Sequence, residues 1–481
     1  MTLATAWYQS FNFVTSLYIF AFIFFIVGLK GLTGPNTAVK GNKIAAVGMV
    51  IAVVASLIGV GPDGIAVINK SSDVIVIVLG VLIGTALGIP SAIKVKMTAI
   101  PQMVALFNGV GGGAVALISF VEYNQWMQEG ATPELQALIP TLFAAIVGSV
   151  SFWGSNIAFG KLQEILPGRP IQLPGQQFIN LALFLYCIGA AVAIATGTDS
   201  VPLFVSILVA AALLGNMVVL PIGGADMPVV ISLLNAFTGL SAAAAGIALQ
   251  NVILIVAGMI VGASGTILTN LMAVAMNRSV PSIIAGGFGG GSGAVAAGPE
   301  GEEGRTVRST SAQDVAIQLA FARLVVIVPG YGMAVAQAQH AVKELTRVLE
   351  AKGVEVKFGI HPVAGRMPGH MNVLLAEADV PYEQLREMDD INPEFPRADV
   401  VLVIGANDVT NPAAKDSPES PIYGMPILEV DQAAATVVLK RSMGAGFAGI
   451  DNPLFYDEKT SLLFGDAKDS VGEITAEVQS L

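Results

Sequence analysis

Two patterns of hydrophobicity divide the chain. Residues 1–278 form a series of long apolar runs separated by short polar turns, whereas residues 279–481 mix short apolar runs with many charged residues. A helix needs about 20 apolar residues to cross the hydrocarbon layer of a bilayer. The runs have that length and predict nine membrane-spanning helices, at approximately residues 9–29, 43–61, 73–93, 101–121, 138–160, 176–196, 201–220, 227–249 and 251–274.

The composition supports a membrane protein. Apolar residues make up 54% and charged residues 12% of the 481 residues, whereas soluble domains carry about 25% charged residues. This excludes a simple cytosolic globule, and the hydrophobicity excludes a disordered chain. The one cysteine, Cys187, lies in an apolar run, so neither a disulfide framework nor a Cys-based metal site is expected, and no other metal ligands are assigned. A net charge of −11 without basic clusters argues against nucleic-acid binding.

The basic residues indicate how the helices are oriented. One side of the predicted bundle collects eight Lys and Arg residues and the other side only Lys70. Because positively charged loops stay in the cytoplasm, the pattern predicts an amino terminus outside the cytoplasm and a cytoplasmic carboxy-terminal domain. The eight residues on the cytoplasmic side are Lys30, Lys40, Lys43, Lys94, Lys96, Lys161, Arg169 and Arg278.

A few polar side chains interrupt the predicted membrane helices. Asn108 lies in the fourth helix, Asn235 lies in the eighth, and Asp226 stands at the start of the eighth in Gly-Ala-Asp-Met-Pro. Polar groups are costly inside a bilayer, so they mark candidate functional sites. Asp226 equally suits a helix N-cap before Met-Pro, and the sequence leaves both interpretations open. No histidine precedes His340, so the membrane part of this chain offers no imidazole to carry a proton.

The chain divides into two domains joined by a linker. Residues 281–310 are rich in Gly, Ala and Ser, a composition typical of a flexible tether. They separate a membrane domain of residues 1–280 from a predicted α/β domain of residues 311–481. In that domain Ser311-Ala-Gln-Asp resembles a capping box and predicts a short helix to about Phe321.

A strand, a glycine turn and a helix come next. A buried-strand run at residues 323–329 is followed by Gly-Tyr-Gly at 330–332, a helical stretch to about Ala351 and a second strand near residues 354–360. This order is typical of a doubly wound, Rossmann-like fold, whose glycines let backbone N–H groups approach a pyrophosphate at the helix start. An ordinary glycine turn in some other α/β domain is the alternative, because Val335 stands where the fingerprint expects Gly or Ala.

Other strand ends carry groups that suit an anionic ligand. Arg366 follows the second strand, Gly-Ala-Asn-Asp408 follows a strand at residues 399–404, and Lys440-Arg441-Ser442 follows a strand at residues 435–439. The second strand ends without the carboxylate that usually holds a ribose 2′-hydroxyl. We therefore interpret the basic pair as a site for a 2′-phosphate, with a solvated surface pair as the alternative. These features fit either a transporter of ions or solutes gated by a nucleotide-sensing domain or a redox enzyme coupled to ion movement.

Six motifs together resemble one known family over essentially the whole chain, namely the beta subunit of proton-translocating NAD(P) transhydrogenase. The motifs are Gly-Tyr-Gly-Met-Ala-Val-Ala-Gln-Ala-Gln (330–339), Val-Ala-Gly-Arg-Met-Pro-Gly-His (363–370), Val-Ile-Gly-Ala-Asn-Asp (403–408), Lys-Arg-Ser-Met (440–443), Leu-Phe-Gly-Asp-Ala-Lys (463–468) and Ala-Asp-Met-Pro-Val-Val-Ile-Ser-Leu-Leu-Asn (225–235).

The resemblance implies a function and partners. The cytoplasmic domain is expected to hold NADP(H), and a separate alpha subunit of one or two chains, with extra membrane helices, is expected to hold NAD(H). Hydride transfer between the two cofactors is then coupled to inward proton movement through the membrane domain, in a dimer of alpha–beta units. The family binds its nucleotide in a reversed orientation, which weakens the argument for a pyrophosphate at the helix start but not the choice of loops.

The resemblance also implies roles for single residues. Asp226, Asn235 and Asn108 match proton-path positions, and Asp408 matches an aspartate that links cofactor redox state to protonation. Some members carry a histidine at the position of Asn108, so here a partner helix is expected to supply the imidazole. Phe447 replaces the usual Tyr and loses a hydroxyl contact. The implied cofactor-binding residues, with the 2′-phosphate on residues 440–442, are Gly330, Tyr331, Gly332, Val363, Ala364, Gly365, Arg366, Met367, Pro368, Gly405, Ala406, Asn407, Asp408, Val409, Gly424, Met425, Lys440, Arg441, Ser442, Met443, Gly446, Phe447, Asp466 and Ala467.

Overall fold

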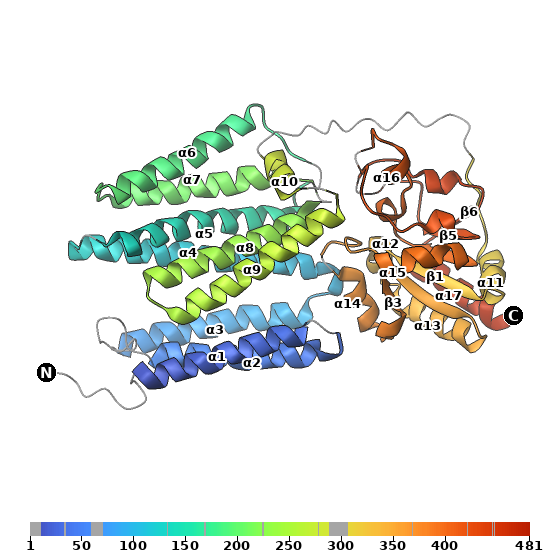
Figure 1. Cartoon of the computed structure of the whole chain (residues 1–481), viewed down its shortest axis with the longest axis horizontal. Coiled ribbons are helices and arrows are strands. Elements are labelled where there is room, and N and C mark those ends of the chain that lie inside the picture. The colour runs from blue at the N-terminus through green and yellow to red at the C-terminus, as the bar shows by residue number, and fades with distance from the viewer. Residues whose placement is uncertain are drawn as a thin grey trace.

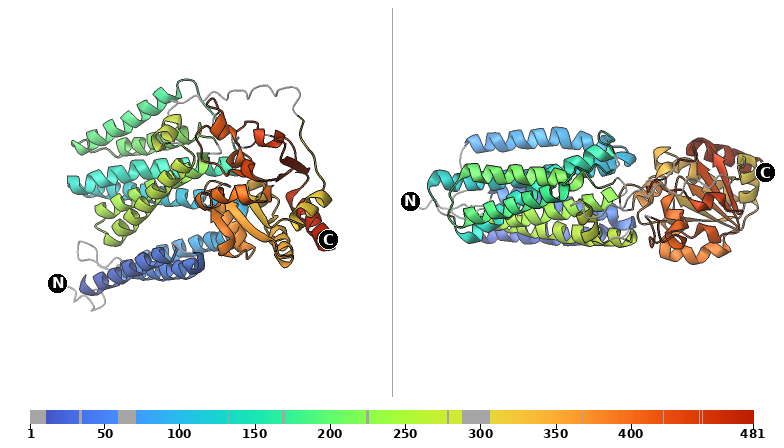
Figure 2. Two further views of the ribbon diagram at one scale, coloured as in Figure 1. Left: turned by 45° about the vertical axis from the view of Figure 1, so that its right-hand side comes forward. Right: turned by 90° about the horizontal axis from the view of Figure 1, so that it is seen from above.

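The molecule consists of a bundle of long helices and an α/β domain that lie end to end (Figure 1, Figure 2). A computed structural model gives this arrangement. It describes residues 11–32, 35–58, 71–131, 133–167, 170–223, 226–277, 279–287, 306–367, 369–420, 422–444, 446 and 448–481.

Within these ranges, nine helices are long and apolar enough to cross a membrane, which confirms the predicted spans. The second helix begins at Pro35, eight residues before the predicted start, because Pro suits the first position of a helix and the segment with Lys40 and Lys43 is helical. The helices are α1 (Phe11–Leu32), α2 (Pro35–Ile58), α3 (Ser71–Lys94), α4 (Ile100–Glu129), α5 (Leu135–Leu162), α6 (Gln176–Ala195), α7 (Val201–Val219), α8 (Met227–Ala248) and α9 (Val252–Ala275).

Small residues bring the helices of the bundle together. α1 packs along α2, α4 along α5 and α8 along α9, and α5 also packs against α7 and α8. Gly112 and Gly148 face each other across α4 and α5, where a Cβ at Gly112 would come within 2.9 Å of the Gly148 carbonyl oxygen. Close backbone approach of this kind replaces the hydrophobic effect between helices in lipid.

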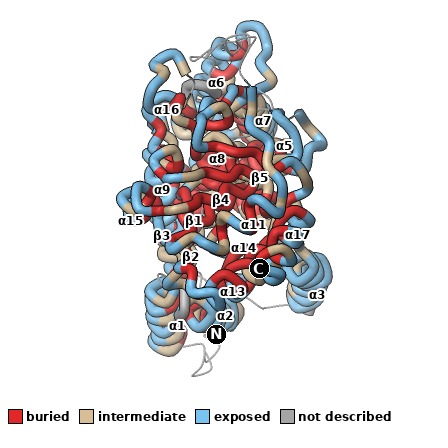
Figure 3. The backbone as a smooth tube through the Cα atoms, turned by 90° about the vertical axis from the view of Figure 1, so that its right-hand side faces the viewer, coloured by how far each residue is buried: buried red, intermediate tan, exposed pale blue. Residues whose placement is uncertain are grey.

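Helix α3 differs from the other membrane helices. None of its most apolar 18-residue stretch is buried, and a Cβ built at Gly80, Gly84 or Gly88 would meet no described atom within 4 Å. Figure 3 shows exposed residues along α3, on the side of the molecule away from α1. The interior of the bundle is therefore built mainly from α4, α5, α7, α8 and α9.

The α/β domain contains one parallel sheet, whose six strands in the described part of the chain follow the order β3-β2-β1-β4-β5-β6. This is the doubly wound order that the sequence predicts. Val325 and Ile327 belong to a hydrophobic cluster on one face of the sheet, and Val326 and Val328 to a cluster on the other. The strands are β1 (Leu324–Pro329), β2 (Glu355–Ile360), β3 (Leu385–Glu387), β4 (Val400–Ile404), β5 (Thr436–Lys440) and β6 (Thr460–Phe464).

The prediction of one continuous helix after the glycine turn is wrong, because this segment forms two helices. α12 (Tyr331–Val335) ends after five residues and α13 (Gln339–Ala351) begins four residues later. Gln337, between them, has φ +51°, a left-handed conformation that does not continue an α-helix. The predicted helix after Ser311 is present as α11 (Ala312–Ala320), and the Ser311 side chain accepts a hydrogen bond from the Asp314 N–H.

The carboxyl ends of the strands face the bundle. α12 follows β1 and contacts the short helix η2 (Met97–Ala99) that precedes α4. The predicted linker stays a prediction, because residues 288–305 lie outside the described ranges. At its two ends, α10 (Val280–Gly287) follows α9, and Ser309 pairs with Leu462 of β6. The remaining helices of the domain are α14 (His370–Glu377), α15 (Met388–Ile391), α16 (Ala413–Asp416) and α17 (Ala467–Ser480).

Candidate functional site

The strand order reverses between β1 and β4, and glycines of their two loops pack against each other there. The Gly330 N–H donates to the Ile404 carbonyl and the Gly332 N–H to the Gly405 carbonyl, both at 2.9 Å. A Cβ at Gly332 would lie 2.7 Å from the Gly405 Cα, and Gly405 itself has φ +67°. Open α/β sheets bind ligands at such a switch point. The loops of residues 330–332 and 405–409 are therefore brought together as one candidate surface.

The short α12 limits what the glycine turn can do. Its Met333 and Ala334 are buried, whereas Val335 is 45% exposed and does not pack against the sheet. A third glycine is not needed at an exposed position, which explains why Val335 is tolerated. Five residues provide little macrodipole, so the structure does not support a pyrophosphate held by a helix start. The two glycines serve the close packing of the loops.

Arg366, in the loop after β2, joins the two domains. Its guanidinium lies 4.4 Å from the ring centroid of Tyr331. It donates to the Leu162 carbonyl at 3.0 Å and contacts Glu164 Oε1 at 3.2 Å, both at the end of α5. Burial raises the pKa of Tyr331, with the Arg366 charge opposing and the Glu164 charge assisting that shift. The predicted cofactor loop is therefore in direct contact with the membrane domain.

Two buried histidines support this loop. His361 accepts from the Val363 N–H through Nδ1 at 3.2 Å and donates from Nε2 to the Pro426 carbonyl at 2.8 Å. Burial lowers the pKa of His361 to about 4, so the residue after β2 is a neutral imidazole. His370 Nδ1 accepts from the Arg366 N–H at 3.0 Å. Burial, and secondly the Arg366 charge, lower the pKa of His370 as well.

Asp408 anchors the loop that follows β5. Its Oδ2 accepts a hydrogen bond from the Ala448 N–H at 2.9 Å. Gly446 lies against the same carboxylate, and a Cβ at Gly446 would clash with it. The neighbouring Asn407 is held by Asn452, whose Nδ2 donates to the Asn407 Oδ1 at 3.0 Å. The structure therefore brings Asp408 and Gly446 together, as two members of the predicted set, whereas Phe447 lies outside the described residues.

Lys440 and Arg441 occupy different environments at the end of β5. Lys440 Nζ donates to the Gly444 carbonyl at 2.9 Å and lies 4.3 Å from the Phe455 ring centroid. Burial lowers the pKa of Lys440, and the charges of Asp451 and Asp408 oppose that shift. Arg441, Ser442 and Met443 are exposed. The lysine thus supports its own loop, and the exposed arginine is the better placed of the two to meet a ligand.

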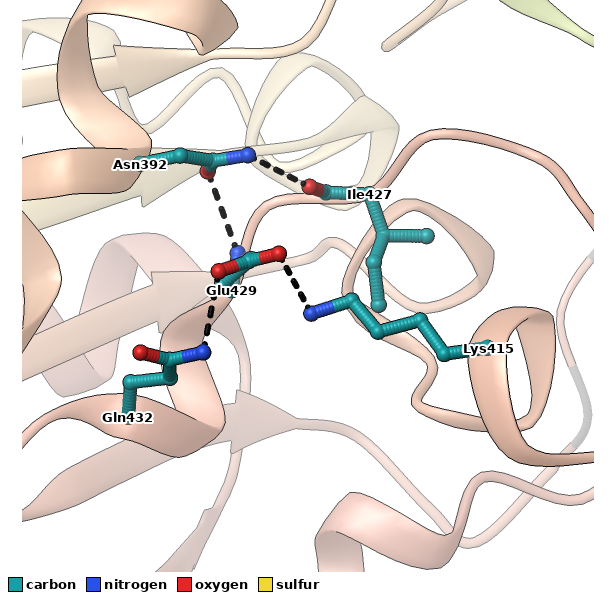
Figure 4. A network of polar contacts seen from close by, with 5 residues as sticks. All are labelled: Asn392, Lys415, Ile427, Glu429 and Gln432. Carbon is teal, nitrogen blue, oxygen red and sulfur yellow. Dashed lines mark hydrogen bonds and ion pairs between the residues drawn. The ribbon is translucent and has the colours of Figure 1, made fainter.

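Gly424 and Met425 belong to a separate group of loops. The Glu429 carboxylate accepts hydrogen bonds from Lys415 Nζ at 2.6 Å and from Gln432 Nε2 at 2.9 Å. Asn392 donates to the Ile427 carbonyl and accepts from the Glu429 N–H (Figure 4). Met425 is buried against Ala414 and Ile427. This network borders a cleft of about 360 Å³ that includes Gly424 and Met425.

Two more residues predicted to bind the cofactor, Asp466 and Ala467, lie after the last strand, β6. Asp466 is the N-cap of α17, and its Oδ1 accepts from the Lys468 N–H at 2.9 Å, while Ala467 is buried in the core. These contacts explain both residues structurally. Pro368 lies outside the described residues. The other predicted loop residues, at the ends of β2 and β4, are Val363, Ala364, Gly365, Met367, Ala406 and Val409.

In the membrane domain, Asn108 is the centre of a buried polar network. Its Nδ2 donates to Ser155 at 2.9 Å and to Ser151 at 3.4 Å, both on α5. Ser151 in turn shares a hydrogen bond of 2.6 Å with Thr238 and donates to the Leu234 carbonyl on α8. Asn235, next to Leu234, is half-buried. The network therefore connects α4, α5 and α8, which carry two of the predicted proton-path residues.

Asp226 lies at the amino-terminal end of α8, nine residues from Asn235. It holds the N-cap position, yet among the described contacts its side chain makes no capping hydrogen bond. Asp408 makes a hydrogen bond within the α/β domain, whereas Asn108 and Asn235 lie in helices of the bundle.

Sequence reasoning missed two residues at the end of α5. Lys161 is only 3% exposed, and its Nζ donates to the carbonyls of Leu220 and Ile222 at 2.5 and 2.7 Å. The sequence counts Lys161 as a loop charge that sets orientation. Glu164 meets Arg366, from which 202 residues separate it. The sequence shows only that Lys161 and Glu164 are charged residues close together at the end of an apolar run. Nothing in that pattern indicates that Glu164 contacts Arg366.

Comparisons with known proteins extend over nearly the whole chain. A family model described as NAD(P) transhydrogenase beta subunit matches residues 14–477. Two Rhodospirillum rubrum proteins named NAD(P) transhydrogenase subunit beta are each 46% identical over 461 residues, which cover 95% of this chain and 97% of each relative. The matched length includes the membrane bundle and the α/β domain. The chain therefore belongs to the NAD(P) transhydrogenase beta subunit family, as its six motifs predict.

Proposed function

We propose that this chain is the NADP(H)-binding and membrane subunit of a proton-translocating transhydrogenase. The observation that carries the proposal is the family match over residues 14–477 of a chain that joins a nine-helix membrane part to a 3-2-1-4-5-6 sheet, as far as the chain is described. The domains are residues 1–280 for proton translocation, 281–310 as linker and 311–481 for the nucleotide. The transporter alternative has no comparable support.

The residues at the carboxyl edge of the sheet fit NADP(H). Arg366 and Arg441 supply planar guanidinium groups for phosphate, and Gly446 lets the backbone of the loop after β5 lie directly against Asp408. His370 is 1% exposed, and its Nε2 has no hydrogen-bond partner in the described structure. In related folds a carboxylate after the second strand binds the ribose 2′-hydroxyl of NAD(H). Here the neutral His361 occupies that position. These features favour the 2′-phosphorylated cofactor.

In the mechanism, this chain positions the nucleotide and does not supply an acid or base for hydride transfer. The nicotinamide of the bound cofactor supplies the redox chemistry. Tyr331 and the loop of residues 363–370 would orient it, the 405–409 loop would support it at the switch point, and residues 440–442 would hold the 2′-phosphate. The proposed alpha subunit, of one or two chains, presents NAD(H) from its own domain.

The proton path is proposed to run along α8. Asn108, Asn235 and their hydroxyl neighbours provide hydrogen-bonding groups within the bundle, and Asp226 takes up the proton near the cytoplasmic end. A helix of the alpha subunit supplies an imidazole near Asn108. Asp408 senses the cofactor state in the α/β domain, and coupling requires that proton and nucleotide bias the same two-state equilibrium.

The assembly is proposed to lie in a bacterial inner membrane as a dimer of alpha–beta units. Basic residues predict that the amino terminus is periplasmic and the α/β domain cytoplasmic. The contact between Arg366 and the end of α5 supports this orientation, because it places Lys161 and the α/β domain at the same end of the bundle.

The decisive experiment compares two variants, Asp226→Asn and Asp199→Asn. Asp199 is an exposed aspartate just before α7, whereas Asp226 follows α7 at the start of α8. Membrane vesicles that contain the assembled enzyme are energised, and NADP⁺ reduction by NADH is followed with and without an uncoupler. We expect Asp226→Asn to lose at least roughly tenfold of the gradient-dependent rate, since a group that carries a proton cannot be replaced by an amide. Solute flux without nicotinamide oxidation in the wild type would favour the transporter instead.

A further inference from the structure

The cytoplasmic end of α5 has an unusual local structure. After Leu162 the chain turns, and Glu164 has φ +61°, a conformation that residues other than Gly rarely adopt. The last carbonyls of a helix lack intrahelical donors. Here the Leu162 carbonyl accepts two side-chain donors, Gln102 Nε2 at 3.1 Å and Arg366 Nη1 at 3.0 Å.

Arg366 uses both of its terminal nitrogens in this contact. Nη1 binds the Leu162 carbonyl and Nη2 lies 3.2 Å from Glu164 Oε1, while the side chain is only 13% exposed. A guanidinium binds a phosphate group through the same parallel pair of donors. The Nη1–Nη2 edge of Arg366 therefore cannot bind the end of α5 and a cofactor phosphate at the same time.

We propose that the Leu162 carbonyl and the Glu164 carboxylate form a docking site for Arg366 that competes with the bound dinucleotide. This inference rests on the proposed function, because it needs NADP(H) at the 363–370 loop. Binding of the cofactor withdraws Arg366 from α5 and loosens the α/β domain from the bundle. By reciprocity, docking of the domain weakens cofactor binding by the same factor.

Hydrogen bonds of Lys161 connect the docking site to the segment that precedes Asp226, the proposed proton site. Lys161, one residue before Leu162, is held by the Leu220 and Ile222 carbonyls in the connection between α7 and α8. That connection leads directly to Asp226. A shift of the connection therefore displaces the end of α5, and with it the two acceptors of Arg366. The contacts form a continuous path from the start of α8 to the nucleotide loop.

The test uses Glu164→Gln in the full chain assembled with its alpha subunit. Glu134→Gln is the matched control, because Glu134 is an exposed glutamate at the opposite end of α5. We expect Glu164→Gln to bind NADP⁺ about two- to fivefold more tightly than wild type, the range of a partly exposed ion pair. Glu134→Gln should bind as wild type does.

Docking itself is measured with a pair of cysteines, Asn277→Cys and Tyr423→Cys. Asn277, after α9, donates to the Tyr423 carbonyl at 3.2 Å, so the two positions report the closeness of the domains. The native Cys187 is fully buried and does not interfere. We expect NADP⁺ to lower the yield of the disulfide, and Glu164→Gln to lower it without any cofactor.

The outcomes separate this inference from the proposed function. If the wild type binds NADP⁺ in preference to NAD⁺, but Glu164→Gln matches Glu134→Gln in both affinity and disulfide yield, the competition is refuted and the function stands. If the wild type shows no preference for NADP⁺, the proposed function fails. A lower disulfide yield for Glu164→Gln together with tighter NADP⁺ binding supports the competition.

Discussion

The two halves of this molecule use apolar side chains in opposite ways. In the α/β domain every residue of β1 and of β4 is buried, and charged residues form the surface. In the membrane bundle large side chains such as Phe20, Leu87 and Phe178 are more than half exposed. The interior of the bundle instead contains small and polar residues such as Gly112, Ser151 and Asn108.

The difference shows which force holds each half together. Burial of apolar surface stabilises the α/β domain in water, whereas lipid is as apolar as the helix surfaces and gives no such advantage between helices. The bundle therefore depends on close backbone approach and on hydrogen bonds. The same kind of substitution should have different consequences in the two halves, and the following experiments test that difference.

The largest effect is expected from Gly405→Ala in the α/β domain. A Cβ at Gly405 would clash with the Gly332 backbone, and its φ is +67°. Overpacking and strain each cost about 1–3 kcal/mol, so we expect the free energy of unfolding to fall by about 4 kcal/mol. Hydrogen exchange of β1 and β4 in the full chain measures it. Gly353→Ala is the control, because Gly353 has φ +87° with open space around it. An equal loss in both variants would show that strain alone matters.

A somewhat smaller loss is expected on acidification, and only in the α/β domain. All three histidines of the chain lie there, and His361 has a pKa of about 4 in the folded state, below its ordinary value. The unfolded state therefore binds more protons between about pH 6.5 and 4. The stabilisation is complete above pH 6.5 and is lost as the pH falls, by about 3 kcal/mol in total.

Hydrogen exchange at pH 7 and pH 5 checks this expectation. Protection of β2 should fall with pH in the wild type and should fall less in His361→Asn, in which His370 is the remaining histidine with a lowered pKa. Protection of α4 and α8 should not follow the same profile, since no histidine lies in the described membrane helices. A parallel loss in both halves would contradict the assignment to His361.

Cofactor affinity should respond to charge at one edge of the sheet only. We expect Lys440→Ala with Arg441→Ala to lose roughly 100-fold in NADP⁺ affinity, because Arg441 would lose a charged hydrogen bond that contributes about 1.5–3 kcal/mol and Lys440 would no longer support the loop that carries it. The control is Lys352→Ala with Arg397→Ala, two exposed residues at the opposite edge that make the same change in charge. Titration calorimetry on the full chain measures both. Equal affinities would refute the phosphate site.

The sequence predicts the membrane helices well because the thickness of a bilayer is an external constraint on their length. It does not reveal that α3 lies apart from the core of the bundle, since hydropathy carries no information on neighbours. Glu164 and Arg366 illustrate the same limit, because their contact depends on how two domains meet.

In the α/β domain, the order of strands and glycine turns predicts the sheet, since parallel strands read as continuous apolar runs. The break at Gln337 is not predicted, because no Gly or Pro marks it. The candidate loops follow from their positions at strand ends. The sequence does not show which of these loops lie together in space. Met425, for example, packs against Ala414 and Ile427, whereas Gly405 lies at the switch point.

The smallest and most direct comparison uses one residue type in the same role in both halves. Ser311 caps α11 in the α/β domain and Ser200 caps α7 in the bundle, and each Oγ accepts the N–H of the third residue after it. Loss of such a cap costs about 1 kcal/mol in water. We expect Ser311→Ala to raise hydrogen exchange of α11 about fivefold. Ser200→Ala should raise exchange of α7 less than about twofold, because a helix in lipid cannot open its backbone to unpaired states. Equal increases in both helices would show that the bilayer does not restrain α7, and that the two halves open by the same route.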